Sequence, residues 1–204
     1  MIQELERLNY PVINLEHLAN HKGSAFGALG EDSQPSQEMF ENMLAMELME
    51  KAFFNGEARP DDTVGQGFEG TWLEDESQRI GALTIPNNIW KAMRSSPLYF
   101  IDIDFEERVN YLVTTYGAFE KEKLANAIIR IQKRLGGLET KKAINYLSEN
   151  NILECFRVLL NYYDKWYTKG LHNRENLNSL LNKIPCAHVN KGNVNKLALL
   201  QNTS

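Results

Sequence analysis

The first residues that could carry chemistry lie in a short loop after an apolar run. Residues 10–15 are expected to form a buried strand, and the loop that follows contains His21, Lys22, Gly23 and Ser24. A Gly- and Ser-containing turn leaving a strand can present backbone N–H groups and a hydroxyl to an anion. We therefore expect Lys22 and Ser24 to hold a phosphate or pyrophosphate. The alternative is a loop that only turns the chain.

A second candidate is the acidic cluster Glu74, Asp75 and Glu76, which directly follows an expected short strand at residues 71–73. Nucleotide-binding folds place a Mg²⁺-holding carboxylate at the carboxyl end of a buried strand. Glu74 or Asp75 is the natural candidate for this role, with Glu76 available to orient a water. Such a site also needs phosphates, because Mg²⁺ is rarely caged by protein alone. The alternative is a solvated acidic turn.

Arg108 lies just past another expected strand, residues 98–103, where a helix begins. In phosphoryl-transfer folds this position often supplies an arginine to the phosphates, and a surface salt bridge is the equally weighted alternative. His17 and His21 are four residues apart, but a helix joining them would have to run into Gly23. Metal binding by this pair is therefore not expected, and no metal is assigned.

The charge is divided unevenly along the chain. Residues 1–110 carry 8 Lys and Arg against 20 Asp and Glu, whereas residues 111–204 carry 14 against 7. This asymmetry indicates an anionic partner for the second half, or attraction between the two halves. The positions best suited to a nucleic acid or another polyanion are basic residues on the expected helices beyond residue 119: Lys123, Arg130, Lys133, Arg134, Lys141 and Lys142.

Aromatic side chains gather beside a lysine in residues 162–167. Such a cluster can stack on unpaired bases. Helical spacing nevertheless favours Tyr163 and Trp166 facing the core, which is the interpretation preferred here.

Cys155 and Cys186 have no metal-ligand spacing and are expected to be buried structural thiols.

The expected elements indicate an α/β fold with a mainly parallel sheet up to residue 118 and only helices afterwards. No apolar stretch of about 18 residues is present, so we expect no membrane span. A reduced, cytoplasmic compartment fits the cysteine content. Strands are expected at 12–15, 71–73 and 98–103, helices at 2–8, 36–55, 86–93, 119–135, 140–149, 151–168 and 175–184, and a fraying tail at 185–204.

Several blocks of this sequence, in order, resemble the tRNA 2-selenouridine synthases. The resemblance covers roughly residues 2–168, and its first block is quite specific. The matching blocks are 12–27, 34–37, 40–42, 74–77 with 80–81, 107–108, 134–137 and 162–164.

The resemblance implies a fusion of an N-terminal rhodanese-like domain, which carries a catalytic Cys, with a P-loop NTPase-like domain. It implies replacement of sulfur by selenium in wobble 2-thiouridine of certain tRNAs, with selenophosphate and geranyl diphosphate as substrates and Mg²⁺ as a candidate ion. By analogy, His21, Lys22, Gly23 and Ser24 line a diphosphate- or tRNA-facing loop. Glu74, Asp75 and Glu76 form the acidic strand end, and Arg108 is the phosphate-facing arginine.

The sequence departs from this family pattern at its N-terminal side. The rhodanese domain, its Cys and the Gly-x-x-x-x-Gly-Lys-[Ser/Thr] loop are missing, and the loop would lie just upstream of Met1. The helix expected at 2–8 also lacks an N-cap residue. We therefore expect a P-loop-like domain over 1–118 without its first strand and phosphate loop, and a helical part over 119–184.

These gaps lead to three functional hypotheses. The chain is expected to need an upstream rhodanese/P-loop polypeptide for selenium transfer, since the nucleophile is missing. The alternatives are a non-catalytic tRNA-binding or regulatory module, and a small nucleotide-dependent kinase-like enzyme that uses residues 22–27 as its phosphate loop. An exposed sheet edge at the missing strand predicts homo-oligomerisation.

Overall fold

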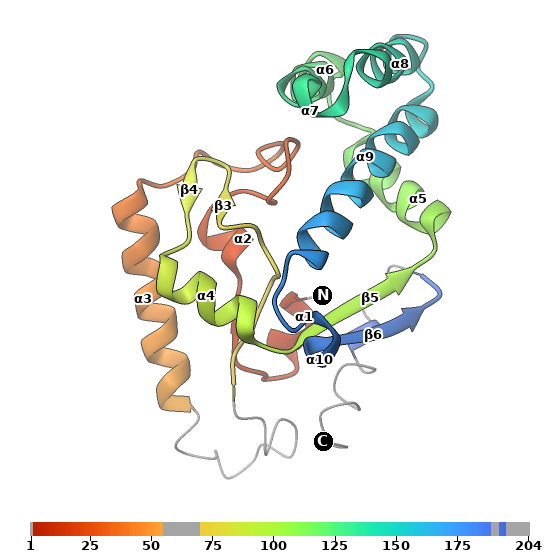
Figure 1. Cartoon of the computed structure of the whole chain (residues 1–204). Helices are drawn as coiled ribbons and strands as arrows, with labels where there is room; N and C mark the ends of the chain where they lie inside the picture. The colour runs from red at the N-terminus through yellow and green to blue at the C-terminus, as the bar shows by residue number, and fades with distance from the viewer. Residues whose placement is uncertain (1, 55–69, 189–191, 195–204) are drawn as a thin grey trace. The chain divides into compact units, whose positions relative to one another are not determined.

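The computed structural model describes residues 2–54, 70–188 and 192–194 (Figure 1). The chain divides into two compact units, residues 1–96 with 190–204 and residues 97–189. The boundary expected at residue 118 falls inside the second unit. The division into domains 1–118 and 119–184 stays a prediction.

The first unit contains four helices and two small sheets among its described residues. β1 pairs with β2 in parallel, with Val12 opposite Trp72, and β3 pairs with β4 in an antiparallel hairpin. The elements, in chain order, are α1 (Ile2–Arg7), β1 (Val12–Ile13), α2 (Leu15–Leu18), α3 (Gln37–Phe54), β2 (Trp72–Leu73), β3 (Arg79–Ile80), β4 (Leu83–Thr84) and α4 (Asn87–Ser95).

The core of the first unit joins α2 and α3 to both small sheets. Phe40 and Leu44, one helical turn apart on α3, are 0% and 1% exposed. They pack in a cluster that contains Ile13 of β1 and Ile80 of β3. Full burial of one such side chain contributes about 1.5–3 kcal/mol. This core therefore fixes the loop that connects β1 to α3.

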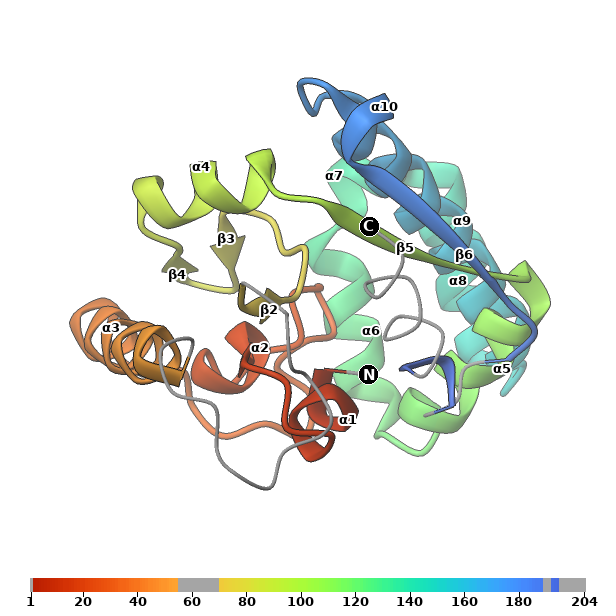
Figure 2. The same cartoon turned by 90° about the horizontal axis from the view of Figure 1, so that it is seen from below.

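The second unit is a helical layer beside a two-stranded parallel sheet (Figure 2). β5 and β6 run in register from Leu98 opposite Leu181 to Ile103 opposite Cys186. The elements are β5 (Leu98–Ile103), α5 (Phe105–Tyr116), α6 (Lys121–Arg130), α7 (Gln132–Leu135), α8 (Gly137–Ser148), α9 (Ile152–His172), α10 (Leu177–Leu180) and β6 (Leu181–Cys186).

Local sequence signals explain where these helices begin. Asp104 caps α5 by accepting the Glu106 N–H at 2.8 Å, and Asn151 caps α9. Gly136, with a φ of 92°, separates α7 from α8. α9 packs against both α5 and α8 and buries Phe156 and other apolar residues. Helix α9 is therefore the element on which the second unit is assembled.

The fold class is confirmed in its broad form. The chain is a mixed α/β protein that is mostly helical, with small parallel sheets. In the described ranges, the strands form three separate two-stranded ladders rather than one mainly parallel sheet. Within those same ranges, no helix is long and apolar enough to cross a membrane.

The C-terminal elements differ from expectation. The helix expected at 175–184 is wrong, since α10 covers only Leu177–Leu180 before the chain becomes β6. Fraying from residue 185 is also wrong for Pro185 and Cys186, because both belong to the ladder with β5. The reason is non-local pairing, which helical periodicity cannot report. Val194 is 0% exposed, so fraying is wrong at that residue too. The tail prediction at 189–191 and 195–204 lies outside the described residues.

Candidate functional site

The loop between β1 and α3 is built around the ring of His21. Asn14 caps α2 by accepting the His17 N–H at 2.8 Å, and the short helix then leads into the loop. His21 is 8% exposed, and its Nδ1 accepts the Gly23 N–H at 3.1 Å. Because Nδ1 is an acceptor, the neutral ring carries its proton on Nε2. His21 therefore organises the loop from the inside.

The backbone of this loop is hydrogen-bonded largely to itself. The Lys22 N–H donates to Gly27 O at 3.0 Å, and the Ser24 N–H donates to Lys22 O at 2.8 Å. The Ser24 hydroxyl oxygen accepts the Phe26 N–H at 3.1 Å. Nζ of Lys22 lies 2.6 Å from a Glu31 carboxylate oxygen. An anion at Lys22 and Ser24 would therefore have to displace contacts within the loop.

Three glutamates gather beside the loop, at the end of β2 and the start of α2. A carboxylate oxygen of Glu74 accepts the Leu15 N–H at 2.9 Å, and burial raises the pKa of Glu74. Glu76 shares a hydrogen bond with Glu16. Burial, followed by the charge of Glu16, raises the pKa of Glu76 to about 8. Glu76 is therefore the member of the pair that holds a proton at neutral pH.

These carboxylates do not form a metal cage by themselves. Within the described part of the chain, no group of three or more His, Cys, Asp or Glu side chains could hold a metal ion. Glu74 is bonded to backbone, and Glu76 is bonded to Glu16. The described carboxylates therefore supply no metal cage of their own, and no step of the function is derived through Mg²⁺.

Two glutamines that the sequence analysis left without a role connect the loop to the β3–β4 hairpin. Nε2 of Gln34 donates to the carbonyl oxygens of Ala19 and Ile80 at 3.0 Å each, and its Oε1 accepts the Ala82 N–H at 2.8 Å. Gln37 bonds both the N–H and the carbonyl of Thr84. The two glutamine side chains hydrogen-bond backbone groups of the hairpin as a neighbouring strand would, and they fix the hairpin against the loop.

Arg108 is held by a carboxylate from another helix. Its two terminal nitrogens donate to the two carboxylate oxygens of Asp164 at 2.6 and 2.9 Å, and its Nε donates to Ile103 O. This hydrogen bond to Asp164 is the main cause that raises the pKa of Arg108. The ion pair thus joins the start of α5 to α9 and brings together two of the sequence blocks noted above.

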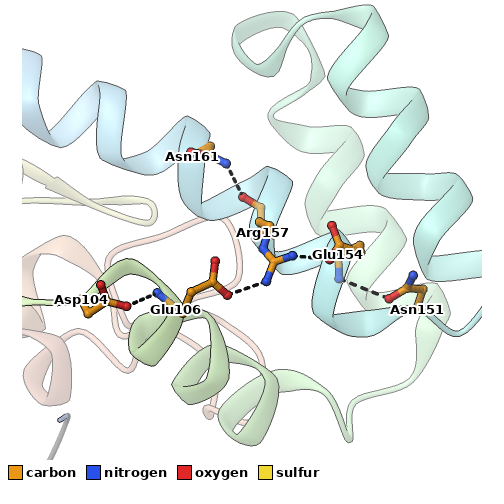
Figure 3. A network of polar contacts seen from close by, with 6 residues as sticks. All are labelled: Asp104, Glu106, Asn151, Glu154, Arg157 and Asn161. Carbon is orange, nitrogen blue, oxygen red and sulfur yellow. Dashed lines mark hydrogen bonds and ion pairs between the residues drawn. The ribbon is translucent and has the colours of Figure 1, made fainter.

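A second ionic network joins the same two helices (Figure 3). Arg157 of α9 forms ion pairs with Glu106 of α5 and with Glu154 of its own helix. Asp104 accepts the Glu106 N–H, and Asn151 accepts the Glu154 N–H. The residues that cap the two helices are therefore tied to the ion pairs that hold them together.

The predicted polyanion-binding residues lie on three successive helices that gather near one end of α9 (Figure 1). All six side chains are exposed. Lys123 pairs with Glu120 at 3.4 Å, and Lys142 pairs with Glu139 at 2.9 Å. The six are Lys123 and Arg130 of α6, Lys133 and Arg134 of α7, and Lys141 and Lys142 of α8.

The aromatic run on α9 differs from the preferred interpretation. Trp166 is 43% exposed and Tyr167 is 61% exposed, so the expected core position of Trp166 is wrong. The core face of α9 is instead formed by residues one to three turns earlier, among them Phe156 and Leu159. Cys155 and Cys186 are both buried and free, as expected.

Comparison with known families identifies the class of protein first. Residues 1–183 match the family described as "tRNA 2-selenouridine synthase AAA domain", so the mixed α/β chain is an AAA-type domain. Because this match covers most of the chain, the chain belongs to the tRNA 2-selenouridine synthase family. The resemblance seen in the sequence is therefore confirmed.

Individual relatives cover the same region. The chain is 31% identical over 183 residues to the tRNA 2-selenouridine synthase of Sulfurovum sp., covering 76% of this chain and 47% of that protein. It is 30% identical over 192 residues to that of Shewanella frigidimarina, covering 80% and 49%. The chain thus spans about half the length of these curated relatives. No solved structure matches it.

Proposed function

We propose that this chain supplies tRNA binding to the exchange of sulfur for selenium at wobble 2-thiouridine, in the cytoplasm. The observation that carries the proposal is the set of exposed cations on α6, α7 and α8. Within the described part of the chain, Arg130, Lys133 and Lys141 form no ion pair with a carboxylate. Cations of this kind are suited to phosphates, which dominate affinity for nucleic acids.

We further propose that the loop at His21, Lys22, Gly23 and Ser24 contacts a diphosphate such as geranyl diphosphate. To bind the phosphate, Lys22 would give up its ion pair with Glu31. The Lys22 and Glu31 side chains are 38% and 29% exposed, and an ion pair of this kind contributes only about 0–1 kcal/mol. The exchange would therefore cost little.

The nucleophile of the reaction is proposed to come from elsewhere. Cys155 and Cys186 are buried, and burial raises the pKa of the Cys155 thiol to about 11. A protonated, buried thiol is a poor nucleophile. The proposal therefore assigns the chemistry to an upstream rhodanese-like and P-loop segment that works with this domain.

Binding of tRNA tests the proposal directly. The affinity of the full chain for tRNA carrying wobble 2-thiouridine would be measured over a range of salt concentrations. The variant Arg130→Ala/Lys133→Ala/Lys141→Ala should bind more weakly, and the salt slope should fall by roughly one for each phosphate contact removed. A matched variant, Arg79→Ala/Lys91→Ala/Lys183→Ala, removes three exposed cations outside α6–α8 and should bind normally.

Two outcomes would contradict parts of this proposal. Unchanged affinity and unchanged salt slope in the α6–α8 variant would exclude this surface. Selenium exchange that stays absent when the upstream segment is added back, with tRNA binding intact, would favour a non-catalytic tRNA-binding module.

Sedimentation of the isolated chain tests the predicted homo-oligomer, which a stable monomer would exclude.

A further inference from the structure

We propose that α9 carries a stacking site for an unpaired nucleotide, built on Trp166 with Arg134 and Lys169 beside it. The proposal rests on the proposed tRNA binding and specifies its mode. The wobble uridine lies in an unpaired loop of tRNA, so a protein that acts on it meets bases with exposed faces. The occupant is therefore a nucleotide of an unpaired RNA loop.

The geometry combines an exposed indole with two cations. The guanidinium carbon of Arg134 lies 5.7 Å from the centre of the Trp166 ring, and Nζ of Lys169 lies 5.3 Å from it. Trp166 is nevertheless 43% exposed. Proteins that bind single strands pair an aromatic face for the base with cations for the adjacent phosphates. A base that stacks on the indole would displace Arg134 or Lys169 from the ring. The displaced cation would then lie close to the phosphate of the same nucleotide.

Neighbouring residues hold this arrangement in place. Tyr162 packs against Trp166 with its ring centre 6.3 Å away and the planes at 61°. Burial raises the pKa of the Tyr162 hydroxyl, and the charge of the nearby Arg134 opposes this rise. Arg134 comes from α7, which contacts α8, and α8 in turn contacts α9. The cation over the indole is thus supplied by a separate helix and lies near a second aromatic residue.

A shallow, open hollow continues from this cluster along α9. It has a volume of about 550 Å³, and Lys169 lines it as well as contacting Trp166. Lys165, His172 and Asn161 also line the hollow. The one carboxylate in its lining, Asp164, is paired with Arg108. The lining therefore offers cations and an amide that can contact a phosphate or a base edge beside the indole.

The competing explanation is that Arg134 and Trp166 only brace α7 against α9. An RNA-binding comparison separates the two explanations. The full chain would be titrated with a fluorescent RNA hairpin that has an unpaired loop, and with the same strand annealed to its complement. Trp166→Ala should weaken hairpin binding by about tenfold and leave duplex binding nearly unchanged. Trp166→Phe, which keeps an aromatic face, should retain most of the hairpin affinity.

The control is Tyr111→Ala, which removes an aromatic side chain that is 50% exposed on α5. It should bind both RNAs normally. Normal hairpin affinity in Trp166→Ala would overturn the stacking site and leave the proposed tRNA binding standing. Absence of any RNA binding by the unaltered chain would overturn both.

If the Trp166→Ala variant does not fold, the fluorescence of Trp166 itself provides a test that keeps this residue. In Trp72→Phe/Trp90→Phe, Trp166 is the only tryptophan left in the chain. Stacking of a base on the indole should quench its fluorescence when the hairpin is added, and the duplex should have little effect. Unchanged emission at saturating hairpin would overturn the proposal.

Discussion

The carboxylate of Glu76 lies directly against the backbone of Gly23. A Cβ built on Gly23 would be 2.6 Å from Oε1 of Glu76, closer than real Cβ contacts come. Gly23 also has a φ of 66°, in the left-handed region that disfavours other residues. The loop and the acidic strand end therefore meet at a position that favours glycine.

Gly23→Ala should therefore destabilise the first unit. The left-handed backbone alone costs about 1–3 kcal/mol for a non-glycine residue, and Glu76 must also move. Urea unfolding would measure the loss. Gly137→Ala is the matched comparison, because a Cβ there meets no atom within 4 Å and the residue begins α8. That substitution should be neutral or stabilising; equal losses in the two variants would contradict the packing described here.

Stability of the folded chain should depend on the proton held by Glu76. Burial and the charge of Glu16 raise its pKa in the folded state to about 8, from an ordinary value of 4.5. The folded state therefore binds more protons than the unfolded state between these values. The contribution of this group is fully present below pH 4.5 and is lost as pH rises through about 8.

Glu76→Gln tests this pH dependence. An amide can donate a hydrogen bond to Glu16 at any pH, so the variant should gain stability relative to the unaltered chain as pH rises toward 8. Thermal unfolding at a series of pH values would measure the difference. Glu38→Gln, at an exposed position on α3, should follow the unaltered chain throughout. A Glu76→Gln difference that stays constant with pH would argue against a shared proton.

Local sequence signals predicted most helices and one of the two longest strands, β5. The helices expected at 36–55, 86–93, 140–149 and 151–168 correspond to α3, α4, α8 and α9, and the strand expected at 98–103 is β5. Leu15 was expected in a strand but begins α2, because Asn14 caps a helix there. β6 was missed because its strand character comes from pairing with β5, more than eighty residues away along the chain. Non-local hydrogen bonding of this kind leaves little trace in the local pattern.

The candidate site shows the same division between local and non-local information. The sequence located the loop and the acidic strand end, but not that Glu76 lies against Gly23. It gave no role to Gln34, whose partners include the backbone of Ile80 and Ala82. Only the folded chain brings these residues together. Trp166 was assigned to the core because helical periodicity identifies an apolar face. Periodicity does not show at which point along a long helix other elements stop burying that face.

Cys155 should resist alkylation while the chain is folded. It is 2% exposed, and burial raises the pKa of its thiol to about 11, so little thiolate forms at neutral pH. In Cys186→Ser, Cys155 is the only cysteine, and its reaction with iodoacetamide can be followed by mass spectrometry. Labelling should be slow in buffer and fast in urea. Equal rates in both conditions would show that the second unit opens readily at α9.

The ion pair between Arg108 and Asp164 should contribute measurably to the stability of the second unit. Its two side chains are 33% and 34% exposed, and two parallel hydrogen bonds join them. A double-mutant cycle with Arg108→Ala and Asp164→Ala should give a coupling energy of about 1–2 kcal/mol, above the usual range for exposed pairs. Arg108→Lys should recover only part of it, because an ammonium cannot make both bonds.

The pair formed by Arg7 and Glu4 provides the comparison, since the Arg7 side chain is 69% exposed. Its coupling should be smaller than that of Arg108 and Asp164, as is usual for exposed pairs within one helix. The same variants bear on the role of Arg108. If this arginine serves phosphates rather than α9, Asp164→Ala should release it and strengthen binding of inorganic pyrophosphate. If its role is to hold α5 against α9, Asp164→Ala should lower stability without raising pyrophosphate affinity, and this is the expected result.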